Sequence, residues 1–323
     1  MRKTRLMCSL VMIAATVFVS GCVTINLVPG PGAIEEKQLS GTGRDKILLL
    51  EVSGLISSHE SDGFIEHPSI LAQMKEALTR AADDTRVKAV VLRINSPGGT
   101  VTASDILYHE LLAFKEKRKI PVIASIMDVG ASGGYYIAMA ADKLVVHPSS
   151  ITGSLGVIMM TVNARGLLEK IGVDAVTVKS GPRKDMGSPF RSLTEEEQAI
   201  FQGVIMSFYD RFLAVIKEGR KNLTAADIKK LADGRIYSGE QATTLGLADS
   251  VGYLDDAIEL AKHESGVSEA TVVTYRRPGE YKNNIYSQFL GSGAATTWNP
   301  LANLDLMALF RGGTPQFMYL WTP

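Results

Sequence analysis

Residues 129–138 read VGASGGYYIA and place one serine, Ser132, among three glycines. Glycine weakens both strands and helices, so such a cluster indicates a turn that needs backbone freedom or close access. A sharp strand-to-helix turn is also a position that exposes a serine as a catalytic nucleophile. Bulky neighbours would block the substrate and the backbone N–H groups that stabilise an oxyanion. The stretch therefore raises two readings, a tight structural turn and a catalytic elbow.

The surrounding sequence predicts an α/β fold. Short apolar runs bounded by turn residues predict buried strands at 46–56, 88–94, 121–127 and 143–148. Between them, residues 69–84 and 103–119 have apolar positions at helical spacing. Strands that alternate with helices of this length form a mostly parallel β-sheet flanked by helices. Ligands and chemistry gather where such strands end and helices begin.

A second glycine-rich junction, RINSPGG at 93–99, follows another of these strands. One such junction alone is most often a tight turn, but two at the same edge favour a site. Gly130, Ser132 and Gly134 also satisfy the G-x-S-x-G spacing of an α/β-hydrolase-type esterase. That fold needs an acid and then a histidine after the serine, and downstream only His147 and His263 occur. The α/β-hydrolase-type esterase is therefore the second-ranked interpretation among enzymes.

If no histidine serves as the base, a lysine can do so when burial destabilises its ammonium. The best candidate is Lys184, which lies between two turn-forming groups in the segment at 178–197, VKSGPRKDMGSPFRSLTEEE. Taken alone, a loop lysine is usually a solvated surface charge. The segment by itself does not decide between these two roles.

Five segments together resemble a known family: INSPGGTV, GASGGYYIAMAADKLVV, TGSLGVI, SGPRKDMGSPFRSLTEEE and DGRIYSGEQATTLGLADSVG. In order and spacing they resemble the single-domain form of the bacterial signal peptide peptidase SppA family, over roughly residues 47–266. INSPGG also resembles the equivalent segment of ClpP. The resemblance implies a ClpP/crotonase-like fold and a serine endopeptidase that degrades remnant signal peptides and other short membrane-derived peptides.

The resemblance also implies a role for each matching residue. Ser132 matches the nucleophile, Lys184 the general base, and Ser154 a hydroxyl that orients the lysine amine. Gly99 and Gly133 match the positions whose backbone N–H groups form the oxyanion hole. Together these residues form a Ser/Lys dyad with its supporting groups.

The histidine triad of ClpP is excluded, because ClpP places its histidine about 25 residues after the serine and Val157 stands there. A lysine base working near pH 7 to 8 needs its pKa lowered by roughly 2 to 3 units, which corresponds to about 3 to 4 kcal/mol. Because the long forms of the family place the two residues on different tandem domains, we expect a homo-oligomer with active sites at subunit interfaces.

The N-terminus predicts export and lipid anchoring. Residues 1–21 have basic residues followed by an apolar stretch too short to span a bilayer, which is typical of a signal peptide. The segment ends in a lipobox-like sequence before Cys22, the predicted lipidation site. We expect a tether at 22–45, a ClpP/crotonase-like peptidase domain at 46–278 and a C-terminal tail at 279–323. The apolar residues of the tail are too interrupted to form a membrane-spanning helix. We expect the tail to pack on the body of the same chain or on a neighbouring subunit.

These features predict a protein of the bacterial cell envelope, lipid-anchored on the non-cytoplasmic side of a membrane and facing the periplasm in a Gram-negative cell. The chain has 34 basic and 34 acidic residues, which argues against nucleic acid as a partner. No cluster has metal-ligand spacing, so we expect neither metal nor cofactor. Two further alternatives are a non-catalytic crotonase-fold scaffold and an acyl-CoA-processing enzyme.

Overall fold

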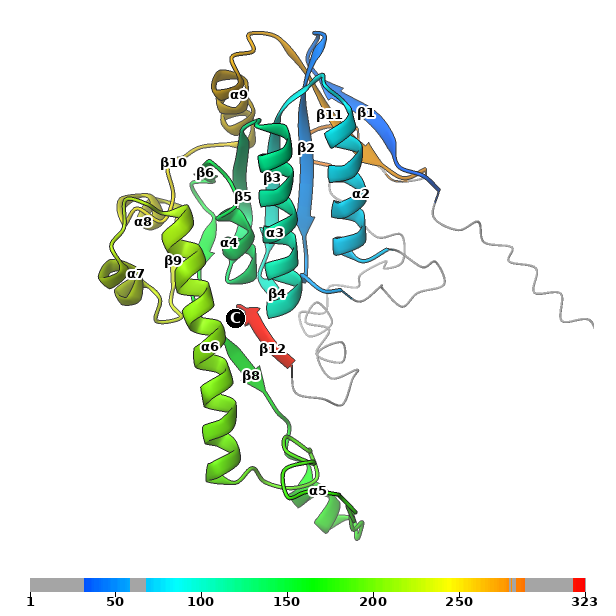
Figure 1. Ribbon diagram of the computed structural model, residues 1–323, viewed down its shortest axis with the longest axis vertical. Helices are drawn as coiled ribbons and strands as arrows, with labels where there is room; N and C mark the ends of the chain where they lie inside the picture. The colour runs from blue at the N-terminus through cyan, green and yellow to red at the C-terminus, as the bar shows by residue number, and fades with distance from the viewer. Residues whose placement is uncertain (1–31, 59–67, 279, 281–282, 288–315, 323) are drawn as a thin grey trace, which may run out of the picture.

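The structure is a computed structural model that describes residues 32–58, 68–278, 280, 283–287 and 316–322 (Figure 1). The signal peptide, Cys22 and the first part of the tether lie outside the described residues. Most of the C-terminal tail also lies outside them.

The main sheet follows the order β1-β11-β2-β3-β5-β6-β10, with β7 paired to β5 and β9 paired to β7. Neighbouring strands are parallel except for β1 with β11 and β7 with β9. The strands are β1 Glu35–Ser40, β2 Asp45–Ser53, β3 Val87–Ser96, β5 Val122–Ala131, β6 Lys143–Val146, β7 Ile151–Gly153, β9 Ile236–Ser238, β10 Ser250–Val251 and β11 Ala270–Arg276. The four strands predicted from the apolar runs correspond to β2, β3, β5 and β6.

Helices cover both faces of this sheet, as Figure 1 shows. The helices of the described residues are α2 Ile70–Asp83, α3 Val101–Arg118, α4 Gly133–Ala138, α5 Arg165–Lys170, α6 Glu195–Gly219, α7 Ala225–Leu231, α8 Gly239–Thr244 and α9 Leu254–Ser265. Along β2, Leu48 packs into the core beneath α2, α3 and α4, whereas Ile47 and Leu49 pack beneath α9. The central strands are mostly apolar because both of their faces are buried. The expected α/β class, a mostly parallel sheet flanked by helices, is confirmed.

A second, three-stranded sheet has the order β4-β12-β8. Its strands are β4 Gly98–Thr100, β8 Ile158–Met160 and β12 Gln316–Leu320, and both pairings are antiparallel. Strand β12 comes from the C-terminal tail, so the described part of the tail packs on the body. The small sheet lies directly after the glycine-rich end of β3.

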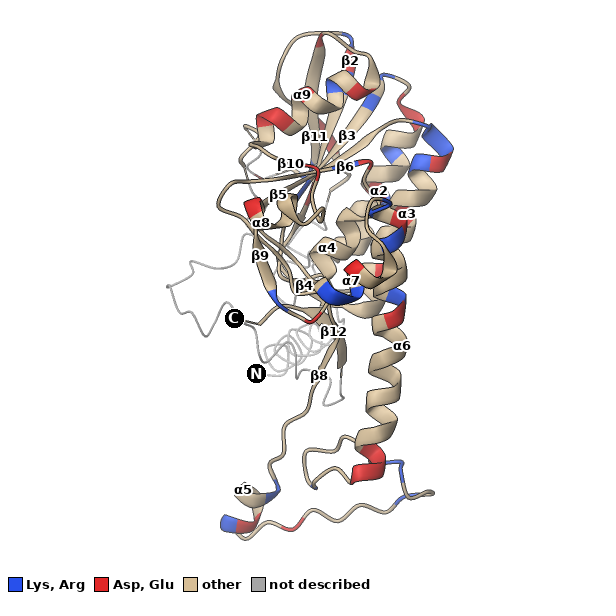
Figure 2. Ribbon diagram, turned by 90° about the vertical axis from the view of Figure 1, so that its left-hand side faces the viewer, with Lys and Arg blue, Asp and Glu red and all other residues tan. Residues whose placement is uncertain are grey.

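Helix α6 extends beyond the body of the fold. Figure 2 shows it running from the main domain to the segment at 161–194, which carries α5 and returns to β8. We call residues 161–194 the arm. Within the described residues α6 alone is long and apolar enough to cross a membrane, by length and composition only. The C-terminal half of α6 packs into the core through Phe212, Val215 and Ile216, as a helix of the folded domain does.

Candidate active site

Ser132 stands on a strained turn between β5 and α4. Its φ of 51° lies in the left-handed region that residues other than glycine rarely adopt. Such a conformation costs on the order of 1–3 kcal/mol and persists only where the surrounding structure enforces it. The Ser132 N–H donates to the Gly153 carbonyl at 2.8 Å, which helps to hold the turn. The side chain is buried, and its Oγ has no hydrogen-bond partner among the described residues.

The glycines around Ser132 are required because a side chain at these positions would lie too close to neighbouring atoms. A Cβ on Gly130 would lie 2.5 Å from the Cγ1 of Ile126, and one on Gly134 would lie 2.8 Å from the Ser96 carbonyl oxygen. Both distances are far below ordinary van der Waals contact. The cluster therefore lets the turn pack closely against β3 and β5.

The second glycine-rich junction packs directly against the first. A Cβ built on Gly133 would lie 3.1 Å from the backbone nitrogen of Gly99. Ile56 fixes this junction, because its N–H donates to the Gly98 carbonyl and its carbonyl accepts from the Thr100 N–H, both at 2.9 Å. Successive backbone groups of an extended chain point to opposite sides, so the Gly99 N–H faces away from Ile56. The two residues predicted to form the oxyanion hole are thus brought together.

Ser154 follows a strand that is paired to the strand before Ser132. Strand β7 runs parallel to β5, and Gly153 pairs with Ala131. Ser154 repeats the positive φ of Ser132, with a value of 50°, and its N–H donates to the Arg235 carbonyl at 2.7 Å. The structure therefore places the two predicted serines at neighbouring strand ends. Ser154 also lines a cavity of about 370 Å³ together with Leu155, Tyr209 and Leu320.

Lys184 lies on the arm and is exposed. The arm leaves the body beyond β8 and returns at the far end of α6 (Figure 1). Within the described chain, Lys184 is therefore not brought to Ser132 or Ser154. The structure assembles four of the five predicted site residues and leaves the predicted base apart from them.

A cluster of ion pairs fixes the part of the arm next to Lys184. Arg191 bonds Asp185 at 2.7 Å and also pairs with Glu197 at the start of α6. Hydrogen bonds from Arg191 and then from Lys179 hold the pKa of Asp185 below its ordinary value. The Arg191 guanidinium also lowers the pKa of Glu197 to about 2. Carboxylates with lowered pKa values contribute stability above their ordinary pKa, so the cluster stays intact at neutral and mildly acidic pH.

Replacing Arg191 by methionine is expected to loosen the arm and to lower kcat/KM for peptide cleavage by about 10- to 100-fold. Arg191 holds the segment that carries Lys184, the predicted base, and a displacement of about 1 Å can cost a catalytic group about 100-fold in rate. The main domain should keep its melting temperature, because the cluster lies outside the core. Steady-state kinetics and calorimetry check this, with exposed Arg165→Met on the same arm as the matched control. Unchanged kinetics would exclude a positioning role for Arg191.

The two tyrosines after the glycines belong to the core. Tyr135 and Tyr136 are both fully buried, and the Tyr135 hydroxyl donates to the Leu247 carbonyl at 2.7 Å. Tyr136 nevertheless contacts the tail, because its ring stacks on that of Tyr319 at 5.0 Å. Sequence reasoning missed Tyr319 and Ile56 as parts of the site. No local motif marks either residue, since each reaches the site through strand pairing.

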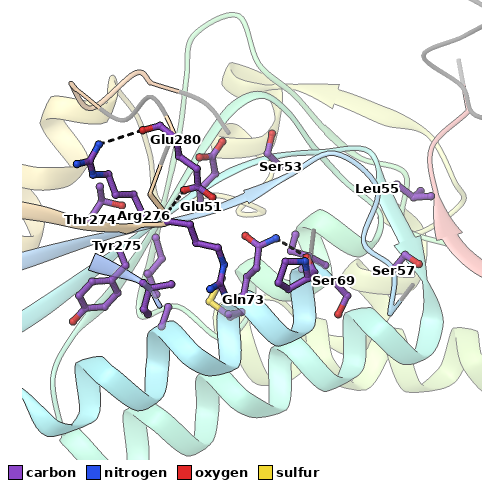
Figure 3. A pocket seen from close by; sticks show the side chains of 17 residues that line it. Glu51, Ser53, Leu55, Ser57, Ser69, Gln73, Thr274, Tyr275, Arg276 and Glu280 are labelled. Atoms are coloured by element: carbon purple, nitrogen blue, oxygen red, sulfur yellow. Dashed lines mark hydrogen bonds between the residues drawn. The ribbon is translucent and has the colours of Figure 1, made fainter. Parts of the chain in front are cut away.

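A second cavity, of about 230 Å³, lies between β2, α2 and the end of β11 (Figure 3). Glu51, Gln73 and Arg276 line it, and Glu51 is paired with Arg93 at 2.8 Å. Its lining does not include Ser132, Ser154 or the oxyanion glycines. The described residues also contain no group of three or more potential metal ligands from His, Cys, Asp and Glu.

Comparison with known proteins decides the family. Residues 114–268 match peptidase family S49. A protein of Enterococcus faecium named "Putative signal peptide peptidase SppA" is 40% identical over 303 residues, which cover 90% of this chain and 86% of that protein. The chain belongs to peptidase family S49. As a member of this family, it is a serine endopeptidase.

Other S49-type proteins are similar over smaller shares of their length. Protease 4 of Salmonella typhi is 35% identical over 230 residues, covering 70% of this chain but 36% of that protein. Among solved structures, the 1510-N membrane-bound stomatin-specific protease in complex with a substrate peptide aligns with a TM-score of 0.44 and 17% identity. That alignment covers 68% of this chain and 80% of the other.

Proposed function

We propose that the chain is a lipid-anchored, SppA-like endopeptidase that degrades remnant signal peptides and other short membrane-derived peptides with a Ser132/Lys184 dyad. One observation carries the proposal. Ser132 stands on a strained elbow with its Oγ unpartnered, beside the backbone of Gly99 and Gly133 and next to the strand end that bears Ser154. This arrangement fits acyl transfer from an extended peptide.

In the proposed mechanism, Ser132 Oγ attacks the carbonyl carbon of the scissile bond while the neutral amine of Lys184 takes its proton. The N–H groups of Gly99 and Gly133 bind the oxyanion, and each such donor is worth about 3 kcal/mol at the transition state. Lys184 then gives the proton to the leaving amine, and the acyl group stays on Ser132. Water, deprotonated by the same lysine, hydrolyses the acyl-enzyme and restores the serine.

The exposed apolar surface of the arm supports a base supplied by a neighbouring subunit. Val176 is 87% exposed, Val178 is 96% exposed and Leu167 is 63% exposed. Side chains of this kind on one projecting segment indicate a surface that another chain covers. A neighbour that covers the arm would also bury Lys184, which is what a lysine base requires. We therefore propose a homo-oligomer in which Lys184 of one subunit serves Ser132 of the next.

Anchoring through Cys22 can be tested by replacing it with serine. We expect the wild-type protein to sediment with membranes, because several acyl chains anchor firmly, and Cys22→Ser to be soluble or to remain unprocessed. Intact-mass analysis of the mature wild-type protein should show an acylated N-terminal Cys22. An unmodified mature chain that begins at another residue would contradict the anchor.

The activity is tested with the full chain and its Ser132→Ala variant on a set of synthetic signal peptides, followed by mass spectrometry. The wild-type protein should cleave several of these peptides, and Ser132→Ala should cleave none at a measurable rate. Ser149→Ala, at an exposed serine outside the site, is the matched control and should behave as wild type. Equal cleavage by the Ser132→Ala variant would refute the proposed nucleophile.

A further inference from the structure

Asp105 of α3 holds the short helix that begins just after Ser132. Its Oδ1 accepts a hydrogen bond from the Tyr136 hydroxyl on α4. The same oxygen accepts from the Arg211 guanidinium on α6, with Nη2 at 3.0 Å and Nε at 3.2 Å. Tyr136 is fully buried, whereas the Arg211 side chain is 48% exposed. The bond to Tyr136 is therefore the buried part of this contact, and a carboxylate acceptor makes it stronger than a bond between neutral groups.

Helix α4 is too short to hold its own position. It has six residues, and isolated helices shorter than about 12 residues are marginal in water. Its first turn is tied to the serine, because the Tyr136 N–H donates to the Ser132 carbonyl at 2.9 Å. The positive φ of Ser132 persists only where surrounding contacts enforce it. Contacts that fix Tyr136 therefore also fix the serine turn.

Two kinds of contact fix Tyr136. Its ring packs against the rings of Tyr108 and Phe212, with centroid distances of 5.4 Å and 5.1 Å. Apolar packing is largely non-directional, whereas a hydrogen bond fixes both the distance and the direction of the hydroxyl. Burial, and then the hydrogen bond to Asp105, raise the pKa of Tyr136. The hydroxyl thus stays protonated and remains a donor to Asp105.

Asp105 also links the serine turn to the strand of the other proposed oxyanion donor. It lies in the second turn of α3, whose N-cap Thr100 directly follows Gly99. The preceding residue, Ser104, packs on the start of α4, since a Cβ on Gly133 would lie 2.5 Å from the Ser104 Oγ. Helix α3 therefore contacts α4 at its first residue and again one turn later. The bond from Asp105 provides the second of these two contacts.

We infer that Asp105 is a positioning residue, which through the Tyr136 hydroxyl keeps Ser132 and the two oxyanion donors in their working arrangement. The inference rests on the proposed function, since it assumes the same nucleophile and the same oxyanion hole. In this role Asp105 exchanges no proton with the substrate and acts only through Tyr136. Its loss displaces the reacting groups but leaves the surface that binds the peptide in place. We therefore expect kcat to fall while KM stays nearly unchanged.

Three variants of the full chain isolate this bond. Asp105→Ala removes the acceptor, and Tyr136→Phe removes the donor but keeps the buried ring. Asp105→Asn keeps the acceptor, because both donors use Oδ1 and the new amide nitrogen takes the place of Oδ2. On one signal peptide, Asp105→Ala and Tyr136→Phe should each lower kcat by about 10- to 100-fold, whereas Asp105→Asn should keep most of it. The double variant Asp105→Ala with Tyr136→Phe should be no slower than the slower single one, since both changes remove one bond.

Controls separate positioning from a general loss of stability. Calorimetry gives the amount of folded protein, and each kcat is expressed per folded chain. Arg211→Met removes the exposed part of the same contact, and Glu116→Ala removes an exposed acid from the same helix. Both should keep kcat within about fivefold of wild type, because exposed ion pairs contribute little. A merely structural role for Asp105 would lower the melting temperature and leave kcat per folded chain unchanged.

The outcomes also distinguish this inference from the proposed function. Wild-type kcat per folded chain in Tyr136→Phe would overturn the inference, and so would a loss confined to KM. If Asp105→Ala does not fold, Tyr136→Phe and Asp105→Asn still decide, because one removes the bond and the other keeps it. When the inference fails in this way but wild type cleaves the peptide and Ser132→Ala does not, the proposed function stands. If wild type cleaves no peptide, the proposed function fails, and the inference fails with it.

Discussion

Replacing Lys184 by alanine is expected to lower kcat for peptide cleavage by about 10⁴-fold or more, as far as Ser132→Ala does. Nucleophile and base act as one unit, so losing either member removes the covalent step. For the same reason, the double variant Ser132→Ala with Lys184→Ala should be no worse than either single one. Single-turnover and steady-state kinetics on one signal peptide provide the comparison.

Controls on the same segments keep this prediction specific. Lys170→Ala removes an exposed lysine at the end of α5 on the same arm, outside the Arg191 cluster, and it should leave most of the activity. Ser154→Ala should give an enzyme that is slower but still active, with a shifted pH profile, because the family resemblance implies that Ser154 orients the base without taking the proton. Near wild-type turnover by Lys184→Ala would show that another group is the base.

The sequence was informative wherever a local pattern determines the structure. Apolar runs predicted β2, β3, β5 and β6, because strands buried on both faces are mostly apolar. The glycines around Ser132 predicted a turn that needs backbone freedom, and Ser132 has a positive φ in the turn between β5 and α4. Gly99 and Gly133 lie together as the family resemblance implied, because two adjacent parallel strands end at the same edge of the sheet.

Features that depend on distant pairing could not be predicted in this way. The pairing of β12 with β4 and β8 joins segments more than 150 residues apart, and nothing in the tail marks its partner. Ile56 likewise reaches Gly99 through an isolated bridge after β2. The position of Lys184 follows from an arm with few contacts to its own body. A sequence motif identifies such a residue but does not place its side chain relative to Ser132.

Mixing inactive variants is expected to restore activity if Lys184 serves a neighbouring subunit. Chains with Ser132→Ala keep the lysine, and chains with Lys184→Ala keep the serine. In a closed ring assembled at random from equal amounts, about a quarter of the interfaces combine an intact serine with an intact lysine. Co-expression with two different tags and tandem purification yields these mixed assemblies. Active-site titration should then find about a quarter of the wild-type sites.

A reciprocal mixture tests the same arrangement from an active starting point. Wild-type chains are co-assembled in equal amounts with chains that carry both Ser132→Ala and Lys184→Ala. If each site lies within one chain, about half of the sites remain active whatever the assembly. If each site spans two chains, only about a quarter remain, because both neighbours must be wild type. A titration near one half, together with no recovery in the first mixture, would place the dyad within a single chain. The arm would then have to fold back toward Ser132 of its own subunit.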